Sequence, residues 1–386
     1  MHAVVRTPAA VVAALILAVT AAATPVRAVP ASPHWDHPGY DAENTSFNPH
    51  ETVITPATVG RLVKKWSVEL RSDDSCSGYG DPIVADGRVF IADHLGISAY
   101  ATGDGAKLWS HDWEGSSNYP ASMAVAGGVL VAGYTDCESM SDPNSGLVGL
   151  DVRTGAELWS GVTAPLIGTM IVDKGVVVTA GRDIYDDTAT VAARLSDGKQ
   201  AWRADGRLIS GASADGVVTG TADSGTVAFD IATGATRWTV NRDLTTGTAS
   251  PAGDVFYGPS DDGKHLEAVS ARDGRVLWTA PDNDGVVATD GARLYCSQNN
   301  GIVALDSRTG RQVWRSDLPA HGLLAATVAG GVVYAARVAL DATTGRAIAG
   351  TPQLSYRVVV TGGVLYQEED GSLTAYAVSG TSVPRR

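Results

Sequence analysis

The sequence has few of the residues that specify helical, disulfide-rich or nucleic-acid-binding proteins. Its 386 residues include only 4 Met, 4 Phe and 3 Cys, against 44 Gly. Abundant glycine with few long apolar side chains favours short strands and turns. Three cysteines are too few for a disulfide scaffold or a four-thiolate zinc site. A net charge of −13 argues against nucleic acid and anionic membrane surfaces as partners, and 44% hydrophobic residues exclude global disorder.

Long apolar runs are also scarce, apart from one at the N-terminus. This run, Ala9 to Ala23, follows Arg6 and is shorter than the roughly 20 residues of a membrane span. The small-x-small pattern Val26-Arg27-Ala28 comes next, so residues 1–28 are predicted to be a secretory signal peptide cleaved after Ala28. No Cys stands at the cleavage point and the tail 381–386 shows no anchor, so we expect a soluble, secreted protein without membrane insertion. We also expect a monomer.

A short phrase recurs along the rest of the chain. Its clearest copy runs from Leu150 through Asp151, Thr154 and Gly155 to Trp159. Its tryptophan recurs 35 to 50 residues apart, with Ala349 at the last position, a spacing typical of propeller blades or helical solenoids. The tryptophans of the series are Trp66, Trp109, Trp159, Trp202, Trp238, Trp278 and Trp314.

Each repeat predicts strands, because short apolar runs follow Gly-Gly or Asp-Gly pairs, which signal hairpins, and no helical period is present. The second repeat predicts four strands, at Ser122–Val125, Val129–Gly133, Leu147–Leu150 and Ala156–Ser160. Three more strands, near Tyr356–Val360, Val364–Gln367 and Leu373–Val378, end the chain and lack a fourth, which Leu62–Glu69 can supply.

The predicted fold is therefore all-β: an eight-bladed β-propeller of four-stranded antiparallel blades, whose last blade is closed by the N-terminal strand. An extended segment over residues 29–60 precedes the propeller, which spans 61–380, with 61–70 completing the last blade. Blade seven, from Val332 to Leu340, has almost no loop between its second and third strands, so its completeness is left open.

The regular tryptophans have two readings, a row of ligand-stacking rings or packing between blades. Even spacing around a ring favours packing, because a single binding site does not need a ring in every blade.

The Asp-x-x-Thr-Gly-x-x-x-Trp phrase resembles the tryptophan-docking repeat of the pyrroloquinoline-quinone (PQQ) propeller superfamily, which includes BamB-like propellers. The N-terminal segment resembles the wrap of those proteins at Trp35-Asp36, Gly39-Tyr40-Asp41, Asn44-Thr45, Asn48-Pro49, Ile54-Thr55-Pro56, Val59 and Leu62. The resemblance covers about residues 35 to 380. It implies either a quinoprotein alcohol or sugar dehydrogenase, with PQQ and calcium, or a non-enzymatic scaffold.

The dehydrogenase pattern implied by the resemblance includes a vicinal Cys-Cys pair, a catalytic Asp and calcium ligands in a considerably longer chain. Here the cysteines stand at 76, 137 and 296, and no position matches the catalytic Asp or the calcium ligands. Hydrolase, zinc-protease and phosphate-loop motifs are also absent. We therefore predict no catalytic or metal residues and no bound cofactor, and leave any cofactor-binding residues unassigned. The chain is expected to be a secreted, non-enzymatic binding or scaffold module. The alternatives are a PQQ- and calcium-dependent dehydrogenase and an extracellular glycan-binding module.

The long connections all belong to one face of the predicted ring, over blades one to three, where function is expected. Acidic and aromatic side chains there suit a sugar, a cationic peptide or calcium, although a solvated acidic rim is an equal alternative. The candidate binding face consists of Asp73, Asp74, Tyr79, Trp113, Tyr119, Asp136, Glu138, Asp142, Arg182, Tyr185, Asp186 and Asp187.

The same face carries two of the three cysteines. In an exported protein Cys76 and Cys137, in loops of adjacent blades, are the natural disulfide. Cys296 lies in a predicted strand and should be a buried free thiol.

Overall fold

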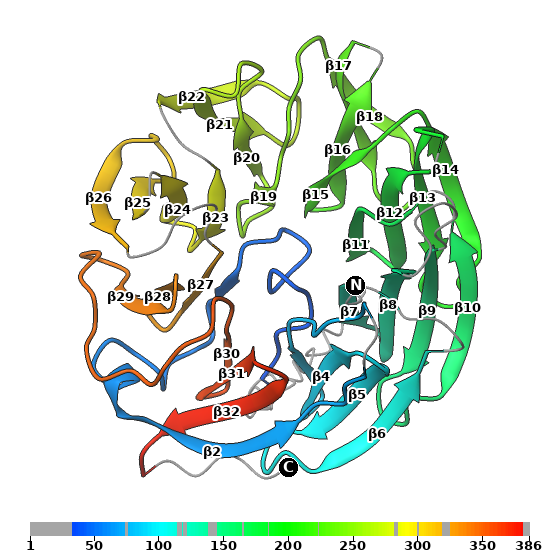
Figure 1. The fold of residues 1–386 in the computed structure, drawn as a ribbon. Helices are drawn as coiled ribbons and strands as arrows, with labels where there is room; N and C mark the ends of the chain where they lie inside the picture. The colour runs from blue at the N-terminus through cyan, green and yellow to red at the C-terminus, as the bar shows by residue number, and fades with distance from the viewer. Residues whose placement is uncertain are drawn as a thin grey trace, which may run out of the picture. The chain divides into compact units, whose positions relative to one another are not determined.

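The computed structural model describes residues 33–73, 76–113, 118, 122–137, 145–163, 166–183, 185–222, 224–281, 285–298, 301–318 and 325–380. In these ranges the chain forms 32 strands and one 3-10 turn, η1 (Val59–Arg61). The strands pair into eight four-stranded sheets, which Figure 1 shows as blades around a central channel. The predicted eight-bladed β-propeller is confirmed.

The blades follow one another in sequence order, each running from its innermost to its outermost strand. Blade one contains β3 (Ile83–Ala85), β4 (Arg88–Asp93), β5 (Gly96–Ala101) and β6 (Lys107–Asp112), and blade two contains β7 (Ser122–Ala126), β8 (Val129–Thr135), β9 (Ser145–Asp151) and β10 (Glu157–Thr163). Blade three contains β11 (Thr169–Asp173), β12 (Val176–Arg182), β13 (Thr188–Arg194) and β14 (Gln200–Asp205), and blade four contains β15 (Ile209–Ala214), β16 (Val217–Ala222), β17 (Gly225–Asp230) and β18 (Thr236–Val240). Blade five contains β19 (Thr248–Ala249), β20 (Val255–Pro259), β21 (His265–Ser270) and β22 (Val276–Pro281), and blade six contains β23 (Val286–Thr289), β24 (Arg293–Gln298), β25 (Gly301–Asp306) and β26 (Gln312–Asp317). Blade seven contains β1 (Phe47–Asn48), β27 (Ala326–Ala329), β28 (Val332–Ala335) and β29 (Val338–Asp341), and blade eight contains β30 (Val359–Thr361), β31 (Val364–Glu369), β32 (Ser372–Val378) and β2 (Leu62–Glu69).

The last two blades depart from the regular pattern. Blade eight is closed as predicted, because the N-terminal strand β2 pairs antiparallel with the C-terminal strand β32, from Leu62 opposite Val378 onward. Blade seven has no outer strand, only an isolated bridge between Leu340 and Ala347, so it is degenerate. Its fourth strand is β1, which adds in parallel to the inner edge of β27.

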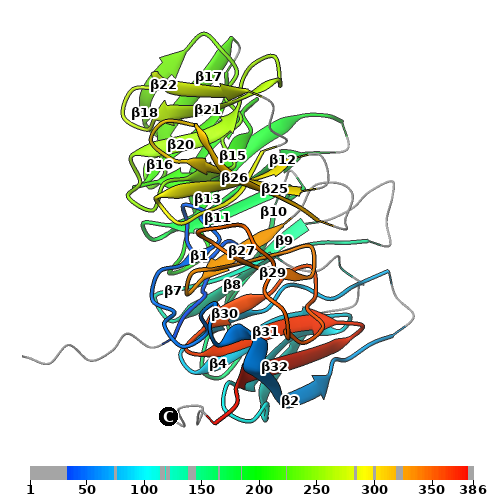
Figure 2. The same cartoon turned by 90° about the vertical axis from the view of Figure 1, so that its left-hand side faces the viewer.

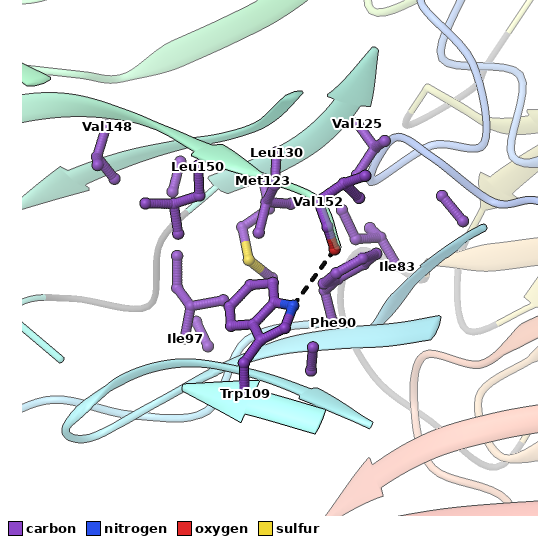
Figure 3. Packing of buried hydrophobic residues seen from close by; sticks show 14 residues of the cluster. Ile83, Phe90, Ile97, Trp109, Met123, Val125, Leu130, Val148, Leu150 and Val152 are labelled. Carbon is purple, nitrogen blue, oxygen red and sulfur yellow. Dashed lines mark hydrogen bonds between the residues drawn. The ribbon is translucent and has the colours of Figure 1, made fainter. Parts of the chain in front are cut away.

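The tryptophans of the outer strands all contact the following blade in the same way. The Trp109 indole N–H donates to the Val152 carbonyl at 3.3 Å, and the ring lies among Phe90, Met123 and Leu130 of blades one and two (Figure 3). The corresponding bonds join Trp66 to Thr102, Trp159 to Leu195, Trp202 to Ile231, Trp238 to Ala271, Trp278 to Ser307 and Trp314 to Ala342.

The recurring spacing within the phrase follows from the turn that receives each indole. The Asp151 carboxylate accepts hydrogen bonds from the N–H and the hydroxyl of Thr154, both at 2.9 Å, which fixes the turn. Gly155 then adopts a φ of +71°, and a Cβ on it would lie 2.5 Å from the Trp109 ring. The glycine is therefore required both for its conformation and for the close approach of the indole.

The N-terminal segment runs around the inside of the channel and hydrogen-bonds to one strand of each blade: β3, β7, β11, β15, β19, β23, β27 and β30. We call residues 35–48 the hoop; in Figure 1 it is the blue chain at the centre of the ring, and in Figure 2 it lies toward the left-hand side of the blades. In ring order the hydrogen bonds join Trp35 to Val84, Asp36 to Val125, His37 to Val172, Ala42 to Ser213, Glu43 to Ala249, Thr45 to Thr289, Ser46 to Val328 and Asn48 to Val360.

Polar side chains within the hoop hold its tight bends. The Asp41 carboxylate accepts hydrogen bonds from the N–H of Thr45 at 2.9 Å and from its hydroxyl at 2.7 Å. Asn44, at a φ of +55°, donates its amide to the Gly247 carbonyl at 2.6 Å. The partners of the hoop lie at or near the ends of the inner strands, next to the short turns. The hoop therefore lies across the channel near the face of the short turns. The cavities of the channel open toward the face of the long connections.

Candidate functional site

The face of the long connections is pinned by a covalent bond. Cys76, in the segment that leads into blade one, is disulfide-bonded to Cys137, just beyond β8 of blade two, across a sequence separation of 61 residues. The predicted pairing is confirmed. Cys296 is fully buried with a free thiol, also as predicted.

An ion-pair network that sequence reasoning missed supports the first connection. The Arg71 guanidinium donates from Nε to the Asp93 carboxylate at 2.9 Å, and its Nη1 donates to Asp112. Burial lowers the pKa of Arg71, but the hydrogen bonds of these two carboxylates outweigh burial and raise it. Arg71 thus ties the start of the connection to the ends of β4 and β6. Only the position of Arg71 at the end of a strand could have indicated this role.

Two predicted ligand-binding aromatics are instead partly buried in the scaffold. The Tyr79 ring lies 4.7 Å from the His94 ring and packs against the core under blades eight and one. Trp113 packs on Tyr134 of β8, with ring centroids 5.2 Å apart. Their position outside the tryptophan register reflects packing of the long connections.

Of the acidic candidates over blades one and two, the structure describes Asp73 and Asp136. Asp73 is exposed beside His94, and Asp136 forms an isolated bridge with Asn118. Four candidates lie outside the described residues: Asp74, Tyr119, Glu138 and Asp142.

The candidates of blade three do lie together, on the connection between β12 and β13. The Asp183 carboxylate accepts hydrogen bonds from the N–H groups of Tyr185 at 2.8 Å and Asp187 at 2.9 Å, which folds the connection into a tight loop. Arg182 and Asp186 form an exposed ion pair across it, 3.5 Å apart. The Tyr185 side chain stands 80% exposed beyond the loop, as an apolar ring presented to solvent.

A cavity of about 680 Å³ lies beside this loop, among blades two, three and four. Its wall combines aliphatic side chains with glycines, hydroxyl groups and one guanidinium. The lining residues are Ser122, Gly133, Thr135, Leu166, Ile167, Gly168, Thr169, Met170, Ala180, Gly181, Arg182, Leu208 and Ile209. Sequence reasoning missed this cavity, since its residues come from strand ends of three blades and share no local pattern.

An acidic hollow of about 420 Å³ adjoins the same loop. Four carboxylates and one guanidinium line it, with Arg203 bonded to Asp205 at 2.6 Å. The complete lining is Asp183, Asp186, Asp187, Thr188, Ala189, Arg203, Asp205 and Gly206. The hollow therefore carries a net negative charge next to the aliphatic cavity.

The mouth of the central channel forms a third cavity, of about 360 Å³, on the same face. The hoop contributes Trp35 and Asn44 to its wall, and the segment before β30 contributes Tyr356 and Arg357. The Arg357 guanidinium donates to the Asp81 carboxylate at 2.7 Å. Across the described ranges no three His, Cys, Asp or Glu side chains are grouped to hold a metal ion, and no helix is long and apolar enough to cross a membrane.

Comparison with known proteins assigns the chain to a family. The family model described as outer membrane protein assembly factor BamB matches residues 57–171, 145–281 and 262–383. The chain belongs to this family. The BamB of Yersinia pestis is 27% identical to this BamB-family propeller over 321 residues, which cover 72% of this chain and 78% of that protein.

Solved structures show the same fold at lower identity. BamB from Moraxella catarrhalis aligns with a TM-score of 0.60 at 19% identity, over 82% of this chain and 99% of that one. A quinohemoprotein alcohol dehydrogenase from Pseudomonas putida HK5 aligns with a TM-score of 0.63 at 14% identity, over 92% and 82%. At these identities the likeness concerns the propeller fold, which enzymes and assembly factors share.

The quinone cofactor of the dehydrogenases does not fit the channel mouth of this chain. PQQ carries several carboxylates, which need cationic partners. The described wall of the mouth holds one cation, Arg357, and Asp81 already neutralises it. No reaction step is therefore assigned to a quinone here.

Proposed function

We propose that this BamB-family propeller is an exported, non-enzymatic binding module that engages a partner through the face of the long connections. The observation that carries the proposal is the disulfide between Cys76 and Cys137, which links the segment entering blade one to the end of β8 in blade two on that face. Rigid loops favour binding, because less conformational entropy is lost when a partner docks.

The distribution of cavities on the ring supports the same face. The cavities beside blade three and at the channel mouth both open where inner strands begin, whereas the opposite face consists of short turns and the hoop. The related protein of Yersinia pestis is named an assembly factor, which agrees with a partner that is itself a protein.

A photo-crosslinking experiment tests the proposal. A benzophenone amino acid replaces Tyr185, which is 80% exposed on the loop face, or Val313, which is 50% exposed on the outer strand of blade six. Irradiation in the culture medium and envelope fractions of the source organism should give discrete adducts at position 185 and none at position 313. Equal labelling at both positions, or none at either, would contradict a dedicated binding face.

Export is a separate part of the proposal, because it depends on the first 28 residues. We expect the mature protein to begin at Val29, after cleavage that follows Ala28. N-terminal sequencing of the protein from the medium and the envelope checks this, and an unprocessed Met1 would contradict it.

The dehydrogenase propellers among the similar structures are the reason to test the alternative of a quinoprotein. Titration of the mature protein with PQQ, with and without calcium, decides it. We expect no saturable binding at high micromolar quinone. Saturable, calcium-dependent binding in the micromolar range would overturn the proposal and call for a screen of alcohols and sugars with a dye acceptor.

A further inference from the structure

We infer that the loop face binds a basic polypeptide segment, with an apolar side chain of the segment in the aliphatic cavity and its lysine or arginine in the acidic hollow. The inference rests on the proposed function and names the chemistry of its partner. It concerns the two cavities that flank the loop between β12 and β13.

The aliphatic cavity is a formed recess with partly exposed apolar walls. Leu166, Ile167, Met170 and Leu208 are each only partly buried, so part of their apolar surface faces the cavity. The Leu166 N–H donates to the Arg182 carbonyl at 3.1 Å, which holds this wall against the end of β12. Its volume of about 680 Å³ accommodates large side chains of a peptide, and burial of these surfaces would favour binding.

The charge of the acidic hollow determines which charge a bound segment should carry. Asp186 and Asp187 are exposed in the acidic hollow, and Asp205, which pairs with Arg203, is 74% exposed at the side chain. Four carboxylates stand against the guanidinium of Arg203 in the wall and that of Arg182, which pairs with Asp186. The hollow therefore keeps a net negative charge, which attracts cations and repels phosphates and anionic membranes. Because Arg182 lines one cavity and Asp183 the other, the two cavities are adjacent, and a segment with adjacent apolar and basic residues matches both at once.

The nature of the walls separates a peptide from a glycan. Sugars bind proteins with their apolar faces stacked on flat aromatic rings, whereas the apolar part of this cavity is aliphatic side chains and one thioether. Tyr185, 80% exposed on the connection between β12 and β13, lines neither cavity. There it can pack against a basic side chain of a bound segment.

A designed peptide tests the inference directly. The probe is a fluorescein-labelled octapeptide of alternating lysine and leucine, titrated with the mature protein and followed by fluorescence anisotropy. Control peptides replace lysine by glutamate, or leucine by serine. We expect saturable binding of the Lys/Leu peptide, weakened by added salt, and at least about tenfold weaker binding of both controls.

Protein variants locate the binding. Asp186→Asn/Asp187→Asn should weaken the Lys/Leu peptide about threefold to tenfold, and Ile167→Gln should weaken it to a similar extent. The matched control, Asp261→Asn/Asp317→Asn, removes two exposed charges from blades five and six and should leave the affinity unchanged. Thermal melting verifies that every variant is folded.

Three results would overturn the inference: no saturable binding, equal binding of a control peptide, or equal weakening by the control variant, which would indicate attraction to the overall negative charge. The crosslinking experiment distinguishes these results from failure of the proposed function. Crosslinks from position 185 without peptide binding would keep the loop face as a binding surface and exclude a basic segment as its partner.

Discussion

The carbonyl oxygen of Ala349 faces Gly60 at the junction of blades seven and eight, so closely that a Cβ on Gly60 would lie 2.7 Å from it. Ala349 occupies the position where the other outer strands have tryptophan. Blade eight lacks the turn that would receive an indole, because its third and outer strands come from the two ends of the chain. Close backbone contact replaces the tryptophan there, and the absence of one aromatic marks where the ring is closed.

Gly60→Ala should therefore lower the free energy of unfolding by about 1–3 kcal/mol, since the added methyl group has to displace backbone. Urea denaturation measures the change. Gly103→Ala is the matched control, because a Cβ at Gly103 meets nothing within 4 Å. Equal stabilities of the two variants would contradict the role of the Ala349 contact in ring closure.

The turn glycines should be more sensitive than other glycines of the same backbone conformation. Gly310 has a φ of +69°, and a Cβ there would lie 2.6 Å from the Trp278 ring, whereas Gly87 at +72° has open space. Gly87→Ala should cost about 1 kcal/mol from backbone strain alone. Gly310→Ala should cost about 1–3 kcal/mol more, because the indole has to move. Thermal and urea unfolding of both variants would show the difference, and a smaller loss in Gly310→Ala would refute it.

The fold was predictable because its determinants are local and repeated. The Asp-x-x-Thr-Gly turn fixes its own geometry through Asp151 and Thr154, so each copy marks a turn and an outer strand without reference to the rest of the chain. The strand bounds differ by a few residues. The inner strand of blade eight begins at Val359 rather than near Tyr356, because residues 356–358 line the channel mouth.

The site was less predictable, because it depends on contacts between segments that are distant in sequence. Tyr79 and Trp113 were predicted to be available for a ligand, but their rings pack against those of His94 and Tyr134. The path of the hoop likewise depends on hydrogen bonds to eight separate strands, which no local pattern encodes. By contrast, the exposed position of Tyr185 on a long connection could be expected from the sequence, because a long connection in a uniform ring is itself a signal; its role in binding stays a prediction.

The disulfide should contribute most of its stabilisation through the unfolded chain. Cys76→Ser/Cys137→Ser releases a link across 61 residues, which amounts to about 4 kcal/mol in the chain-entropy model. The variant should unfold at lower urea concentration, as should the reduced wild-type protein. Unchanged midpoints in both would refute the prediction.

Counting free thiols tests the cysteine pairing, because Cys296 is the cysteine left outside the disulfide. Burial raises the pKa of the Cys296 thiol to about 12, so it should not react with a thiol reagent in the native state. Denaturation without reductant should expose one reactive thiol per chain. Three reactive thiols under these conditions would contradict the pairing of Cys76 with Cys137.

The hoop should make the ring less stable as pH rises. Burial raises the pKa of the Glu43 carboxyl to about 7, and the charges of Asp41 and Asp173 add to this effect. Because the ordinary value of 4.5 applies to the unfolded chain, the folded chain retains this proton between pH 4.5 and 7 while the unfolded chain loses it. The stabilising contribution of protonated Glu43 to the folded state is complete below pH 4.5 and is lost as the pH approaches 7. The free energy of unfolding should therefore fall over this interval.

His37 of the hoop contributes with the same sign. Burial lowers its pKa, but the hydrogen bond and the charge of Asp36 outweigh burial and raise the pKa above 6.5. Its stabilising contribution is therefore present below pH 6.5 and is lost as the pH rises through the higher folded value. The two residues together predict a decline in stability from pH 4.5 to beyond neutrality.

Glu43→Gln isolates the carboxyl in this decline, because glutamine keeps the shape and never ionises. The variant should match the wild type near pH 4.5 and exceed it by about 1 kcal/mol at pH 8, where the wild type carries a partly buried negative charge among other carboxylates. Urea midpoints across this range measure the effect. Asp317→Asn, which removes an exposed charge from blade six, is the control and should leave the slope unchanged. A Glu43→Gln profile parallel to that of the wild type would show that the hoop does not govern the response to pH.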